Sequence, residues 1–122
     1  MTTDQRTFPN SPTSVTGARR FVLGMIRGVA RDIADSVALM VSELATNSLL
    51  HAGTGFQVRV DRSTEEVRVE VIDRGGGVPA VRTPAPSETS GRGLRIVENF
   101  ADNWGVRSSP PGKAVWFTLA LH

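Results

Sequence analysis

The sequence has no cysteine among its 122 residues. Disulfide bonds, thiolate metal sites and cysteine nucleophiles are therefore excluded. It also has no run of about 20 apolar residues that would indicate a transmembrane helix. The polar residues 1–14 contain no apolar core of a secretory signal. We therefore expect a cytoplasmic protein that has no membrane partner.

Lysine is nearly absent as well, because Lys113 is the only lysine among 14 basic residues. The net charge is only +2, and the arginines are spread from Arg6 to Arg107 between acidic residues. Proteins that bind nucleic acids usually gather their basic residues on one element, so we expect a mixed-charge surface and no nucleic-acid partner. The planar guanidinium group does suit phosphates and carboxylates, which leaves a nucleotide or an acidic partner open.

The length and the hydrophobic fraction of 39% are typical of one globular domain, which we expect to cover residues 15–122. Residues 1–14 contain two prolines. We expect this N-terminal segment to be flexible, with room for a short edge strand near residues 6–8.

Apolar residues at helical spacing predict two helices in the first half of the chain. One covers about residues 15–31, and the other covers about residues 33–51 with Asp32 as its N-cap. Gly53 and Gly55 end the second helix. The buried stripe of the second helix consists of Ile33, Val37, Met40 and Leu44.

Alternation of apolar and polar residues predicts two hairpins in the second half. Residues 56–61 and 67–71 form the first hairpin, and residues 103–107 and 114–119 form the second. A short helix over residues 94–100 separates them. Helices grouped before and between antiparallel strands predict an α+β fold, in which one sheet carries helices on one face.

Three polar side chains follow the stripe of the second helix. Glu43, Asn47 and His51 are spaced i, i+4 and i+8, so they form one line along a regular helix. Carboxylate and amide oxygens suit Mg²⁺, which keeps several waters and usually arrives with substrate phosphates. Asn47 and water would therefore suffice as ligands. The plainer interpretation is a solvated helix face, with His51 as a helix-end residue.

A second cluster lies at the end of the predicted strand that contains Val71. Asp73 ends this strand, and the glycines of residues 75–77 follow. Glycine lets the backbone turn sharply and approach a ligand closely. The carboxylate of Asp73 can accept a hydrogen bond from an exocyclic amine such as that of adenine. The alternative is a flexible glycine turn that Asp73 initiates.

A third cluster, residues 91–94, opens the short helix with the sequence Gly-Arg-Gly-Leu. Backbone N–H groups at a helix N-terminus bind anions, and Arg92 adds positive charge. Neither the P-loop nor the dinucleotide-binding glycine motif is present. The proline-rich residues 78–90 before this cluster predict a long loop, which is more often a functional lid than idle. A simple helix entry after a mobile loop remains the alternative.

In this order the motifs resemble those of the GHKL superfamily, which includes gyrase B, Hsp90, histidine kinases and MutL. Residues 43–51 resemble its N box, residues 73–77 its DxGxG box and residues 91–94 its second glycine box. The resemblance extends over about residues 18–119. The compact length and the Arg-Arg-Phe-Val sequence of residues 19–22 are most similar to the anti-sigma-factor serine/threonine kinases.

The resemblance implies a Bergerat fold: a two-layer α/β sandwich with a mixed, mostly antiparallel sheet. The implied cofactors are ATP and Mg²⁺. Glu43 would be the catalytic base, Asn47 would hold Mg²⁺, and residues 78–90 would form the ATP lid. The nucleotide-binding residues implied are Asn47, His51, Asp73, Gly75, Gly77, Val78, Gly91, Arg92, Gly93, Leu94 and Thr118.

The same resemblance implies two protein partners. They are a sigma factor and an anti-anti-sigma factor, whose serine or threonine would be phosphorylated. A kinase is therefore the leading hypothesis, and the alternative is a nucleotide-binding partner-switching module without kinase activity. A scaffold with a vestigial site is disfavoured because the motif set is complete. The resemblance also implies a homodimer, but the sequence indicates no interface.

Overall fold

The computed structural model describes residues 1–75 and 94–122, together with the helical backbone of residues 89–93. These residues contain five strands, three α-helices and one π-helical turn. In chain order they are β1 (Thr2–Phe8), α1 (Thr13–Met25), α2 (Arg31–Asn47), η1 (Ser48–Ala52), β2 (Phe56–Arg62), β3 (Glu66–Asp73), α3 (Thr89–Phe100), β4 (Asn103–Ser109) and β5 (Gly112–Ala120).

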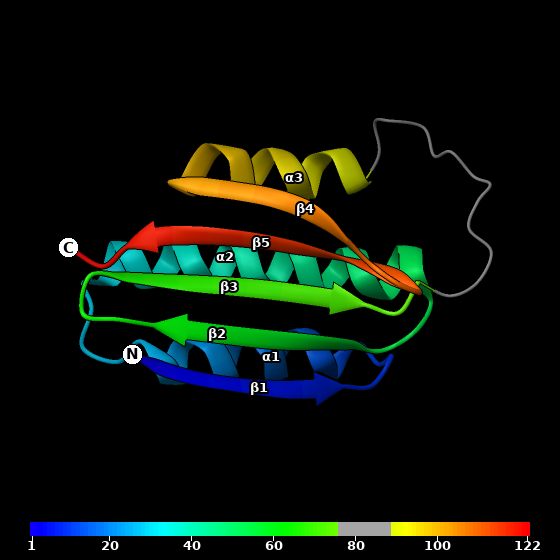
Figure 1. Ribbon diagram of the computed structural model, residues 1–122, viewed down its shortest axis with the longest axis horizontal. Coiled ribbons are helices and arrows are strands. Elements are labelled where there is room, and N and C mark those ends of the chain that lie inside the picture. Colours follow the sequence, from blue (N-terminus) through cyan, green and yellow to red (C-terminus); the bar gives the residue numbers. More distant parts are fainter. Residues whose placement is uncertain (76–88) are drawn as a thin grey trace.

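The strands form one sheet in the order β1-β2-β3-β5-β4. The helices lie on one face of this sheet (Figure 1): α1 contacts β1 and β2, α2 contacts β3, and α3 contacts β4. The expected α+β fold of two layers is therefore confirmed. The family resemblance implies a mixed sheet, whereas every pair of neighbours among the described strands is antiparallel.

Alternating side chains of the central strands form the core between the two layers. Val58 and Val60 of β2 are fully buried, while Arg59 between them is exposed on the opposite face. Phe117 of β5 is also fully buried in this core. From the helical layer, α2 contributes Val37, Met40, Val41, Leu44 and Ala45. Burial of apolar surface contributes about 25 cal/mol per Å², so this contact between layers stabilises the fold.

Helix α2 corrects the expectation that no segment is apolar enough to cross a membrane. The segment Arg31–Ala52 has the length and the mean hydropathy, 1.2, of a weak candidate span. In the structure its apolar stripe packs against the sheet and is part of the core. Packing within the fold therefore accounts for the apolar residues of this stripe.

Helix α1 is shorter than predicted, because it covers Thr13–Met25 rather than residues 15–31. Gly28 adopts a left-handed conformation with φ of 90°, which turns the chain out of the helix. The last turn is also capped from outside, since Arg62 Nη1 donates a hydrogen bond of 3.0 Å to the Met25 carbonyl oxygen. The helical spacing of apolar residues continues beyond Met25, so the sequence predicted a longer helix than the structure has.

The N-terminal segment and the start of α2 also differ from the predictions. β1 covers Thr2–Phe8 and pairs with β2 along its length. Half of the segment expected to be flexible is therefore an edge strand, which includes the expected residues 6–8 and begins four residues earlier. The N-cap of α2 is Ala30, whereas Asp32 lies in the first helical turn. There the Asp32 carboxylate accepts a hydrogen bond of 3.0 Å from the backbone N–H of Ile33. An acidic side chain in this position favours the helix through its dipole.

Helix α3 begins at Thr89, five residues before the predicted start at Leu94. Thr89 and Ser90, which the sequence assigned to the loop, therefore belong to the helix. Gly91 and Gly93 lie within its first turns rather than ahead of it. The rest of the predicted lid, residues 78–88, lies outside the described residues.

The sheet face away from the helices carries an ion pair between a buried carboxylate and a half-exposed arginine. Glu70 of β3 is only 3% exposed and accepts two hydrogen bonds from Arg107 of β4, 2.7 Å from Nε and 3.1 Å from Nη2. The hydrogen bond to Glu70 raises the pKa of Arg107 above its usual value. Trp116 of β5 lies between these strands, and the Arg68 guanidinium stacks 4.9 Å from its ring. This cluster ties β3 to β4 across β5.

Candidate functional site

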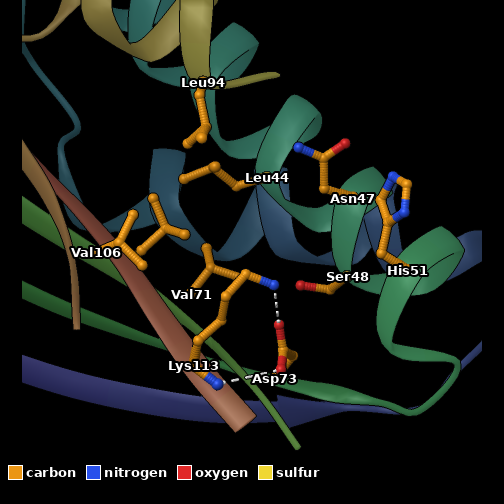
Figure 2. Close-up of a pocket in the computed structure, with 10 residues that line it drawn as sticks. Leu44, Asn47, Ser48, His51, Val71, Asp73, Leu94, Val106 and Lys113 are labelled. Atoms are coloured by element: carbon orange, nitrogen blue, oxygen red, sulfur yellow. Dashed lines mark hydrogen bonds and ion pairs between the residues drawn. The ribbon is translucent and has the colours of Figure 1, made fainter. Parts of the chain in front are cut away.

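Four segments meet at one end of the sheet (Figure 1): the end of β3, the turn η1, the start of α3 and the connection from β4 to β5. A cavity of about 160 Å³ lies between them. Its lining residues are Leu44, Asn47, Ser48, His51, Val71, Asp73, Leu94, Val106, Lys113 and Val115 (Figure 2). The cavity therefore draws on both layers of the fold.

Apolar side chains form most of the cavity wall. Leu44 comes from α2, Val71 from β3 and Val115 from β5, and all three are almost completely buried. Leu94 of α3 and Val106 of β4 complete this wall. A concave apolar surface with a few polar groups is typical of sites for small organic ligands, and it suits the flat face of a nucleobase.

Asp73 is the buried acidic group of the cavity, with an exposed fraction of 5%. Its Oδ1 accepts hydrogen bonds from two backbone N–H groups, that of Gly75 at 2.9 Å and that of Lys113 at 3.3 Å. Its Oδ2 accepts a third hydrogen bond from Lys113 Nζ at 3.0 Å (Figure 2). Gly75 has φ of 67°, a conformation that favours glycine and brings its N–H onto the carboxylate.

Asn47 supplies an unsatisfied polar atom at the other wall of the cavity. Its Oδ1 is buried and has no hydrogen-bond partner among the described residues. Buried polar atoms in native proteins are almost always satisfied by protein, water or an ion. An amide oxygen that has no partner among the described residues suits a hard cation or a water molecule as its partner, and it fits the chemistry of Mg²⁺.

The π-helical turn η1 begins directly after Asn47 and is centred on Leu50. Such turns insert an extra residue into the helical repeat and are frequent at functional sites. The regular line of Glu43, Asn47 and His51 predicted for one α-helix is therefore broken after Asn47. Ser48 and His51 nevertheless both line the cavity.

The sequence profile of the histidine kinase-like ATPase domain matches residues 8–119, which is most of the chain. The chain belongs to this family. It is also 36% identical over 88 residues to the protein named anti-sigma F factor from Pasteuria penetrans. The matched region covers 61% of this chain and 59% of that relative, so the chain spans about three fifths of the relative's length.

Within this ATPase domain, the cavity brings together four of the predicted site residues: Asn47, His51, Asp73 and Leu94. Glu43 lies one helical turn before Asn47 on α2 but is not among the described residues that line the cavity. Gly75 contacts the site through its hydrogen bond to Asp73.

The remaining predicted residues divide into those near the cavity in the chain, those outside the described residues, and Thr118. Gly91, Arg92 and Gly93 lie in the first turns of α3, near Leu94 in the chain. Gly77 and Val78 lie outside the described residues. The structure does not bring Thr118 to the cavity, since its hydroxyl lies on the other sheet face, 3.5 Å from Asn103 Nδ2. We therefore leave Thr118 out of the site.

Six of the cavity residues were not among the predicted site residues: Leu44, Ser48, Val71, Val106, Lys113 and Val115. Lys113 is the only charged residue among these six. Lys113 and Val115 alternate with Ala114, so they share the helix-facing side of β5. Pairing of Ile72 with Ala114 brings Lys113 beside Asp73. The alternation along β5 was readable in the sequence, but the strand pairing that gives Lys113 its neighbour was not.

Proposed function

We propose that this ATPase domain binds Mg·ATP in the cavity and transfers the γ-phosphoryl group to a serine or threonine of an anti-anti-sigma factor. In the same proposal it sequesters a sigma factor in the cytoplasm. The name of the Pasteuria relative supports this direction. Two groups in one cavity carry the nucleotide site: the buried Asn47 Oδ1, which has no hydrogen-bond partner among the described residues, and the buried Asp73 carboxylate.

Each wall of the cavity has a role in this proposal. Asp73 accepts a hydrogen bond from the exocyclic amine of the base, and Leu44 and Val71 pack against the base. Asn47 Oδ1 would hold Mg²⁺, which would supply neutralisation of phosphate charge. The backbone N–H groups at the start of α3 face the phosphates, as helix N-termini do in other anion sites.

Glu43 would act on the protein substrate rather than on the nucleotide. It lies four residues before Asn47, on the same side of α2. From there its carboxylate would take the proton of the partner's hydroxyl group as the hydroxyl oxygen attacks the γ-phosphorus, the bond from phosphorus to the β–γ bridging oxygen breaks, and ADP leaves. Phosphoryl transfer depends mainly on such positioning and on charge neutralisation.

Calorimetric titration of ATP with and without Mg²⁺ tests the site, with Asn47→Ala as the variant. We expect Mg²⁺-dependent binding that Asn47→Ala weakens about tenfold or more, because a metal ligand is lost. Asn103→Ala is the matched control, since this asparagine lies on β4 with its amide near Thr118 on the far sheet face. No binding of ATP by the unmodified protein at millimolar concentration would contradict the proposal.

A partner-switching module that binds nucleotide without transferring phosphate is the second candidate. The position of Glu43 outside the described cavity lining favours it. Incubation with radiolabelled ATP and the anti-anti-sigma partner separates the two functions. If the chain is a kinase, Glu43→Ala abolishes partner labelling and leaves ATP binding largely intact, while Glu65→Ala at the exposed β2–β3 connection changes neither. Equal loss of partner labelling and of ATP binding in Glu43→Ala would contradict the role of Glu43 as the catalytic base.

A further inference from the structure

Lys113, the only lysine of the chain, contacts Asp73, the residue that would bind the nucleobase in the proposed function. Its Nζ is 3.0 Å from Asp73 Oδ2, and the two residues line the same cavity (Figure 2). The carboxylate is 5% exposed, whereas the Lys113 side chain is about half exposed. Lys113 is therefore the more exposed member of the pair, and its ammonium group is held at the carboxylate that would face an incoming base.

Hydrogen-bonding capacity defines what this pair can still bind. A carboxylate has about four acceptor positions, two on each oxygen. On Asp73, the N–H groups of Gly75 and Lys113 occupy Oδ1, and Lys113 Nζ occupies one position of Oδ2. One acceptor position of Oδ2 and two N–H donors of the ammonium group remain. The pair thus presents an acceptor and a donor 3.0 Å apart.

An adjacent acceptor and donor match two kinds of purine edge. Adenine has an amine donor at position 6 beside the acceptor N1. Guanine and hypoxanthine have the acceptor O6 beside an N1–H donor. A carboxylate alone would face O6 with its own lone pairs and reject 6-oxopurines, whereas lysine is a common partner of guanine O6. The flexible stem of Lys113 lets its ammonium group reach either side of the acid.

We propose that Lys113 is a base-specificity residue and that the Asp73–Lys113 pair admits 6-oxopurine nucleoside triphosphates to this site beside ATP. This inference rests on the proposed nucleotide function. It assigns Asp73 to the N1–H group of a 6-oxopurine and Lys113 to its O6. With adenine, Asp73 accepts from the amine and Lys113 donates to N1.

Inosine triphosphate is the sharpest probe, because its base replaces the 6-amino group of adenine by oxygen and adds no 2-amino group. Calorimetric titration compares it with ATP on the intact chain, on Lys113→Met and on Arg59→Met. The last variant removes a cation from the far sheet face and controls for net charge. Thermal unfolding confirms that each variant is folded.

We expect the unmodified protein and Arg59→Met to bind inosine triphosphate within about tenfold of ATP. Lys113→Met should lose about tenfold or more in affinity for inosine triphosphate, and clearly less for ATP. A purely structural role of Lys113 would weaken both nucleotides equally and leave their ratio unchanged.

Three results would overturn the inference. The first is that the unmodified protein binds ATP but not inosine triphosphate, which would leave the proposed function intact. This result refutes the inference even if Lys113→Met does not fold. Another is an unchanged affinity ratio in Lys113→Met. The third is binding of neither nucleotide, which overturns the proposed function as well.

Discussion

Replacement of Gly75 by alanine should destabilise the fold through two separable effects. The first is the backbone conformation, because φ of 67° costs a residue with a side chain about 1–2 kcal/mol. The second is crowding, because a Cβ atom at this position would meet the Pro111 carbonyl oxygen and lie 2.8 Å from the Gly112 Cα. Forcing an extra carbon into such a contact costs about 1–3 kcal/mol.

Gly53 offers a matched comparison for this prediction. Its φ of 68° is almost the same, but a Cβ atom there would meet nothing within 4 Å. Gly53→Ala therefore has only the backbone cost. The free energy of unfolding should be lower for Gly75→Ala than for Gly53→Ala by about 1–3 kcal/mol. Urea unfolding at 25 °C measures the difference as a shift in the transition midpoint at constant slope.

The same substitution should affect the site, because the Gly75 N–H group holds Asp73 Oδ1. Gly75→Ala is therefore expected to weaken ATP binding more than Gly53→Ala does. Equal free energies of unfolding for the two variants would refute the reasoning, since they would mean that the contact with Pro111 and Gly112 relaxes without cost.

Two further predictions concern charged groups on the sheet. Arg107→Met should lower the thermal unfolding midpoint, because it leaves the buried Glu70 carboxylate without its two hydrogen bonds from Arg107. Adding Glu70→Met should recover part of this loss, because the unpaired buried carboxylate is then removed. An equally low midpoint in the double variant would contradict the ion-pair explanation. Burial acts to raise the pKa of Asp61, but hydrogen bonds from Thr3 and Arg59 outweigh it and hold this pKa below the usual 3.8. A depressed pKa gives stability that is present above about pH 4 and lost as the pH falls through the folded-state value. The stability gap between the unmodified protein and Asp61→Asn should therefore narrow on acidification below about pH 4 in chemical unfolding experiments, and a constant gap would argue against it.

Local patterns predicted the elements of the fold well, because each has a short-range cause. The alternation of Val58 and Val60 with Arg59 predicted β2, since side chains of a strand alternate between faces. The end of α1 was missed because apolar spacing continues beyond Gly28, whose left-handed conformation stops the helix. Similarly, β1 is almost entirely exposed, so its sequence carries little apolar signal, and its pairing with β2 is what makes it a strand.

A cavity residue was predictable from the sequence where a single local motif contains it. It was not predictable where two segments distant in the sequence form that part of the cavity. Asn47 and Asp73 were found because a helix spacing and a strand-end acid point to them separately. Lys113 lies beside Asp73 only because β3 pairs with β5, and no local sequence pattern predicts this pairing. The placement of Thr118 failed for the same reason, because which sheet face it occupies depends on that register.

The pairing of β1 with β2 has a consequence for the biogenesis of the protein. Phe8 pairs with Phe56 and Thr2 with Arg62, 48 and 60 positions later along the chain. At a synthesis rate of about 5–20 residues per second, β1 is synthesised about 2–12 seconds before its partner strand. The β2–β3 hairpin, whose strands are close in sequence, can form as soon as it emerges. We therefore expect the sheet to grow outward from this hairpin, which then captures the waiting N-terminal strand, with stacking of Phe8 on Phe56 at 5.5 Å securing its end.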